Sequence, residues 1–80
     1  MSQAILDAAI LQVLSDREEL ATEKYVMLAL FVEFRLKPTY TEIRKSLKLH
    51  EEKENTVSVR SDCGSVLWGI TDVGRAQTMI

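Results

Sequence analysis

The sequence is poor in the residues that build covalent or metal chemistry. It has one cysteine, one histidine and one proline in 80 residues, and 6% of its residues are aromatic. The single cysteine, Cys63, excludes an internal disulfide and indicates a free thiol in a reducing compartment. One histidine and one cysteine cannot form a metal cluster of the usual ligand spacing. We therefore expect no bound metal and no other cofactor.

Signals for catalysis and for membrane insertion are also missing. The three glycines, Gly64, Gly69 and Gly74, do not form a phosphate-binding loop. The carboxylates of Glu51 and Glu52 lie in a wholly polar segment, which does not favour a general acid–base pair. The N-terminus lacks the basic region and the continuous apolar run of a signal peptide. We expect a cytoplasmic protein that is not an enzyme and has no membrane anchor.

The residues that are present indicate one small globular domain, residues 1–80. The chain is 46% hydrophobic and 28% charged, which is ordinary for a folded protein. A domain of this size is often marginally stable alone, and a homodimer would bury more surface. The net charge is −2, yet residues 35–60 hold seven basic and four acidic side chains. This basic middle is compatible with nucleic-acid contact, whereas the overall acidity argues against tight nonspecific binding.

Two helices are expected in the first half of the chain. Residues 24–36, KYVMLALFVEFRL, are apolar on every side of a helix, which is typical of a core or a membrane. The run is shorter than the roughly 20 residues that span a bilayer, so we expect the central helix of the domain, ended by Pro38. Residues 3–15 predict an amphipathic helix that covers the central helix or pairs with its own copy, which makes residues 1–16 a candidate dimerisation element. Its apolar stripe consists of Ile5, Leu6, Ala9, Ile10, Val13 and Leu14.

The second half predicts a helix, an ambiguous polar segment, a hairpin and a last helix. Thr39 and Glu42 have the spacing of a capping box, which opens a helix over residues 40–48. The polar segment 50–55, HEEKEN, is compatible with a loop or with a short solvated helix. Residues 73–80 predict a short closing helix.

Alternation of β-branched residues over 56–60 and 65–71 predicts a β-hairpin with a turn at residues 62–64. The expected buried side of this hairpin is formed by Val57, Val59, Val66, Trp68 and Ile70. A competing interpretation continues a helix from Glu51 through Arg60 and leaves a single strand. The β-branched alternation favours the hairpin.

Two segments resemble a winged-helix DNA-binding domain. Residues 38–49, PTYTEIRKSLKL, resemble the first helix of a helix-turn-helix, and residues 66–76, VLWGITDVGRA, resemble the exit of the wing. The resemblance covers about residues 24–80. It implies an α+β, winged-helix-like three-helix core with a C-terminal β-hairpin wing, plus an extra N-terminal helix and a short closing helix. It places the recognition helix after Leu49, where this chain has the atypical segment HEEKEN.

The resemblance implies a small DNA-binding transcriptional regulator of bacterial or phage type, with double-stranded DNA as its partner. In such a domain, phosphate contacts position the protein and base contacts specify the sequence. The expected contacts are Arg44, Lys45 and Lys48 for phosphates, His50, Lys53 and Asn55 for the groove, and Arg60 and Ser61 for the wing. On pattern alone, a solvated helix face explains the first three equally well.

A second class of function is compatible with the same sequence. A winged-helix scaffold can serve as a protein-interaction module that binds or inhibits a protein partner, and the net negative charge and the glutamates of HEEKEN fit that interpretation. A third alternative is a domain whose only activity is to form a homodimer.

Overall fold

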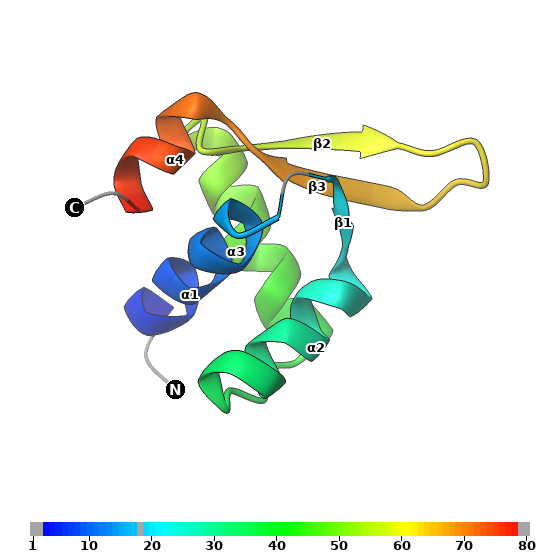
Figure 1. Ribbon diagram of the computed structural model, residues 1–80. Helices are drawn as coiled ribbons and strands as arrows, with labels where there is room; N and C mark the ends of the chain where they lie inside the picture. The colour runs from blue at the N-terminus through cyan, green and yellow to red at the C-terminus, as the bar shows by residue number, and fades with distance from the viewer. Residues whose placement is uncertain (1–2, 18, 79–80) are drawn as a thin grey trace.

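The computed structural model describes residues 3–17 and 19–78, and in these residues it has four helices and three strands. The strands form one antiparallel sheet in the order β1-β3-β2, which lies against the helices (Figure 1). This arrangement confirms the α+β, winged-helix class. In chain order the elements are α1 (Gln3–Ser15), β1 (Ala21–Thr22), α2 (Glu23–Phe34), α3 (Tyr40–Glu52), β2 (Thr56–Arg60), β3 (Val66–Ile70) and α4 (Asp72–Thr78).

Helix α1 is the central helix of the domain. It contacts α2, α3, α4 and β3, and its apolar stripe, apart from the exposed Ile5, lies in the hydrophobic core. The prediction that this helix packs on residues 24–36 is confirmed, because α1 contacts α2. The prediction that it is an extra helix outside the three-helix core was wrong, because α1, α2 and α3 form that core. Burial of each buried leucine or isoleucine side chain of α1 contributes about 1.5–3 kcal/mol to the free energy of unfolding. The core consists of Leu6, Ala9, Ile10, Val13, Leu14, Ala21, Val26, Leu30, Ile43, Leu47 and Trp68.

Helix α2 is peripheral, although it is apolar on every side. Only Val26 and Leu30 of this helix are buried. The helix begins at the N-cap Thr22, whose hydroxyl accepts a hydrogen bond from the amide of Tyr25. It ends before Arg35, which has a left-handed backbone with φ 57°, and so it stops earlier than Pro38 alone predicts.

Helices α2 and α3 form the helix-turn-helix. Residues 40–49 therefore belong to its second helix, and the expectation that they form the first was wrong. Residues 50–52 complete the last turn of α3, residues 53–55 form a turn, and β2 follows directly. The ambiguity of residues 50–60 is thus resolved as a helix end followed by a strand, without a further helix after Leu49.

The hairpin is confirmed, but its buried side differs from the expectation. Val57 pairs with Gly69 and Val59 with Leu67, so both valines lie on the sheet face opposite Trp68 and are about half exposed. The core side of β2 is polar instead. On that side Thr56 is buried, and its hydroxyl donates to the carbonyl oxygen of Leu47 at 3.2 Å. Trp68 is buried as expected.

The Ile-Thr-x-x-Gly-Arg segment at the wing exit has a packing explanation. The backbone amide of Thr71 donates to the carbonyl of Asn55 at 2.9 Å, and its hydroxyl accepts from the amide of Gly74 at 3.0 Å. Gly74 lies so close to the carbonyl of Asn55 that a Cβ there would collide with it. Arg75 donates to the carbonyl of Ser15 at 3.1 Å. These contacts fix α4 at the end of the molecule opposite the hairpin tip (Figure 1); residues 79–80 of the expected last helix lie outside the described range.

Candidate nucleic-acid interface

The start of α3 is set by a capping box. The hydroxyl of Thr39 accepts from the amide of Glu42 at 3.2 Å, and the carboxylate of Glu42 accepts from the amide of Thr39 at 3.0 Å. The backbone hydrogen bond from Thr39 lowers the pKa of Glu42 below its ordinary value of 4.5. The cap fixes the start of α3 at Tyr40, and the packing of the helix on the core, which buries Ile43, Ser46, Leu47 and His50, leaves the opposite side to solvent.

The inner face of α3 is tethered to α1 by a buried polar network. Nε2 of His50 lies 2.9 Å from the backbone carbonyl oxygen of Asp7, which only accepts, so Nε2 carries the proton. The amide nitrogen of Asn55 lies 3.2 Å from Nδ1, which then accepts. The hydroxyl of Ser46 donates to the carboxylate of Asp7. These bonds lock the angle between the two helices.

This network corrects the expected groove contacts. His50 is 5% exposed and Asn55 is 6% exposed, so neither side chain can face a DNA groove. Their roles are structural: they join α1, the end of α3 and the turn before β2. Lys53 is exposed in that turn.

The outer face of α3 carries an unpaired cationic stripe. Thr41, Lys45 and Lys48 are spaced four and three residues apart, which places them on one side of the helix, and all three are exposed. Among the residues that the structure describes, neither lysine takes part in a salt bridge. The acidic side chains Glu51 and Glu52 follow in the last turn. The outer face therefore carries its lysines in the second and third turns and an acidic residue, Glu52, four positions after Lys48.

Arg44 is exposed but already has an anionic partner. Its Nη2 lies 3.0 Å from Oε2 of Glu23 and its Nε lies 3.2 Å from Oε1, a two-point contact between α3 and the first turn of α2. This hydrogen-bonded contact raises the pKa of Arg44. Both residues line a hollow of about 590 Å³ between α2, α3 and the start of β3 beside the hairpin turn, together with Lys24 and Tyr40. The charge of Arg44 is thus partly neutralised within the protein.

The hairpin projects to one side beyond the helices (Figure 1). Arg60 is exposed at the end of β2, and the amide of Ser61 donates to the carbonyl of Ser65 at 2.7 Å to close the turn. Gly64 occupies the position with φ 89° that favours glycine. At the tip, hydrogen bonds from Ser61 and then Ser65 lower the pKa of Cys63 to about 7.

The structure brings part of the expected site together. Lys45 and Lys48 share the outer face of α3, whereas Arg60 and Ser61 lie on the projecting hairpin. Sequence reasoning missed Thr41, which stands on the stripe one turn before Lys45. Its spacing from Lys45 could have identified it, because residues four positions apart lie on the same face of a helix.

The described residues offer neither a metal site nor a membrane-spanning helix. They contain no group of three or more His, Cys, Asp or Glu side chains arranged to hold a metal ion. In residues 3–17 and 19–78, no helix has the length and apolar character needed to cross a bilayer.

Known proteins resemble this chain in fold. No family model and no curated protein matches the sequence. Among solved structures, a single-site mutant of Lactococcus lactis ZitR superposes with a TM-score of 0.68 at 21% identity, covering 91% of this chain and 46% of that one. A double mutant of the same protein in its apo form has a TM-score of 0.70 at 20% identity, covering 95% and 53%. This chain therefore spans about half the length of those proteins, and the likeness shows that it shares their winged-helix fold.

Proposed function

We propose that this chain is a small DNA-binding regulator of bacterial or phage type, acting in the cytoplasm, which places α3 in the major groove of duplex DNA. The observation that carries the proposal is the exposed stripe of Thr41, Lys45 and Lys48. Unpaired lysines are free to neutralise phosphates, and a threonine can hydrogen-bond either a phosphate or a base edge.

The dimensions of α3 suit this role. Thirteen residues make a helix about 20 Å long and roughly 10–12 Å in diameter, and the major groove is about 12 Å wide. In this docking Lys45 and Lys48, in the second and third turns, face the DNA. Glu52 lies four residues after Lys48 on the same face, so its repulsion of the phosphates lowers the affinity.

The number of available cations predicts modest affinity. Lys45, Lys48 and Arg60 can each neutralise one phosphate, with Lys53 at the edge of the same surface. Three or four phosphate contacts predict a slope of log K against log salt of about −3, since each contributes roughly −0.9. Binding to random DNA should therefore be measurable at low salt and weak at physiological salt.

A salt titration on a random-sequence duplex, read by fluorescence anisotropy, tests this function. We expect Lys45→Gln/Lys48→Gln to make the slope less steep by about 2. The matched control Lys24→Gln/Lys37→Gln removes the same charge from two exposed lysines outside the stripe and should leave the slope unchanged. If the two double variants have equal salt slopes, net charge alone explains the change in DNA binding, and the proposal is refuted.

A protein-interaction module is the second candidate, because the end of α3 is acidic. Glu51 and Glu52 are exposed, and Glu54 follows in the turn. Charge reversal of these glutamates should strengthen DNA binding if α3 faces DNA, whereas it should weaken capture of a purified protein partner if this end is the binding surface.

A homodimer stays a prediction, and so does its contact through α1. Most of the apolar stripe of α1 is buried in the monomer core, whereas Ile5 is exposed. A dimer through α1 would therefore use the exposed side of this helix, which includes Ala4, Ile5 and Ala8. Sedimentation velocity over a concentration series measures whether one forms.

A further inference from the structure

The outer side of α2 exposes an unusual amount of apolar surface. Leu28 is 60% exposed, Phe31 is 45% exposed and Val32 is 63% exposed, and all three lie within two turns of this one helix. Contiguous exposed apolar surface on a small protein marks an interaction site more often than scattered single residues do.

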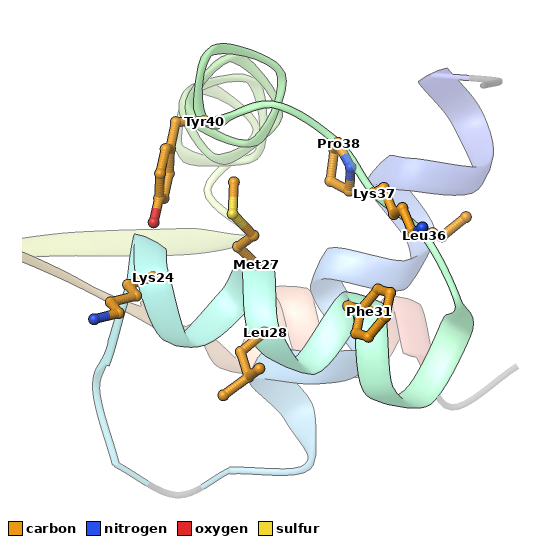
Figure 2. A pocket seen from close by; sticks show the side chains of 8 residues that line it. All are labelled: Lys24, Met27, Leu28, Phe31, Leu36, Lys37, Pro38 and Tyr40. Carbon is orange, nitrogen blue, oxygen red and sulfur yellow. The ribbon is translucent and has the colours of Figure 1, made fainter.

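Part of this surface is hollowed into a groove of about 370 Å³, between α2 and the segment that leads into α3 (Figure 2). Half-buried Met27 and Leu36 line it, together with buried Pro38 and the exposed rings of Phe31 and Tyr40. Its volume lies in the range of roughly 300–1,000 Å³ that is typical of binding sites. The lining is almost wholly apolar, so an occupant must supply apolar side chains.

The charges around the groove have one sign. Lys24 and Lys37 lie toward its opposite ends, and none of the described residues that line it has a carboxylate (Figure 2). Nζ of Lys37 lies 5.4 Å from the centre of the Phe31 ring, so its cation stays at the edge of the apolar surface. An occupant that is apolar in the middle and acidic at its flanks complements both features.

We propose that the groove binds an acidic amphipathic helix of another protein. From Lys24 to Phe31 the axis of α2 rises about 10 Å, which matches two turns of a docked helix with apolar anchors at i, i+4 and i+7. Carboxylates flanking those anchors pair with the two lysines. This activity is separate from the proposed DNA binding, which uses the outer face of α3.

Two other occupants fit less well. A second copy docking through the same face brings the lysines of both copies to one interface, where like charges repel. Duplex DNA supplies phosphates for the lysines, but it has no row of apolar groups to fill a groove lined by Met27, Phe31 and Leu36.

The test uses three labelled synthetic peptides of about 15 residues, long enough to hold a helix when docked. The first has leucine at i, i+4 and i+7 and glutamate around them; the second has lysine in place of each glutamate; the third has the composition of the first in shuffled order. Anisotropy titrations compare wild type with Phe31→Ser, and with Leu28→Ser as a second groove variant. Val32→Ser is the matched control, because Val32 is exposed on the same helix but does not line the groove.

We expect wild type to bind the acidic peptide and to discriminate against the other two. Phe31→Ser or Leu28→Ser should weaken binding at least about tenfold, as loss of a central anchor does, while Val32→Ser changes it less than twofold. Lys24→Gln/Lys37→Gln should remove the preference for the acidic peptide. Lys45→Gln/Lys48→Gln should bind the peptide as wild type does, whatever its effect on DNA.

Three results would overturn the proposal. The first is no saturable binding at millimolar peptide, and the second is equal binding of the acidic and basic peptides. The third is a concentration-dependent homodimer that Phe31→Ser abolishes, which would assign the groove to a second copy of this chain.

Discussion

Removing the carboxylate of Glu23 should strengthen DNA binding, because that carboxylate holds the guanidinium of Arg44. The two residues make hydrogen bonds of 3.2 Å and 3.0 Å. In Glu23→Gln the guanidinium is released beside the lysine stripe, where it can neutralise one further phosphate. Each phosphate contact contributes roughly −0.9 to the salt slope, so the slope should steepen by about 0.9. Raising the salt from roughly 50 to 200 mM should then cost the variant about 3.5-fold more affinity than wild type.

Fluorescence anisotropy with a random-sequence duplex over a salt series measures this slope. Glu33→Gln is the matched control, because Glu33 is an exposed glutamate of the same helix that makes no ion pair among the described residues. It should leave the slope unchanged. Arg44→Gln should change the slope less than Lys45→Gln does, since Arg44 is already paired. If Glu23→Gln and wild type have the same slope, Arg44 is not near the phosphates and the docking of α3 is wrong.

Three further predictions concern packing and titration. Gly74→Ala should lower the free energy of unfolding by about 1–3 kcal/mol in a urea titration, because the new Cβ collides with the carbonyl of Asn55; a negligible loss would contradict that close approach. Because Thr39 lowers the pKa of folded Glu42 below 4.5, this pair contributes stability above that pH and loses it as the pH falls through the folded pKa. Glu42→Gln should accordingly flatten the acid limb of stability against pH, and an unchanged limb would count against the capping box. Alkylation of Cys63 should rise with a midpoint near pH 7 in the folded protein and near pH 9 in denaturant, whereas one common midpoint would exclude the hydrogen-bonded thiolate.

Local signals predicted most of the elements correctly. The capping box at Thr39 marked the start of α3, and the β-branched alternation marked the hairpin, because both depend on neighbours within a few residues. The wing-exit segment carries one signal of this kind, because the hydroxyl of Thr71 accepts from the amide of Gly74 three residues later. Its other contacts are long-range: Gly74 lies against the carbonyl of Asn55, and Arg75 donates to the carbonyl of Ser15.

Features that depend on distant residues were mispredicted. His50 was expected to be exposed because it lies in a polar segment, but its partner, Asp7, is 43 positions away in the sequence. The valines of β2 alternate correctly, but alternation does not say which face meets the core; the bond from Thr56 to the carbonyl of Leu47 turns the polar side inward. Helix α2 was expected at the centre on apolarity alone, yet apolar residues also cover protein surfaces.

The same limit applies to the candidate site. The cations of α3 could be identified from their spacing, but the partial neutralisation of Arg44 could not, because Glu23 lies 21 positions earlier. The groove on α2 was likewise invisible in the sequence. It is formed where the segment before α3 passes over Met27, and only the fold brings these residues together.

The most direct test of the central claim is an NMR titration of the labelled protein with a short duplex at low salt. The account predicts that the largest amide shifts occur at Thr41, Lys45 and Lys48, with smaller shifts at Arg60 and Ser61 and none along α1. Shifts confined to α2, or spread evenly over the surface, would contradict the docking of α3 in the groove.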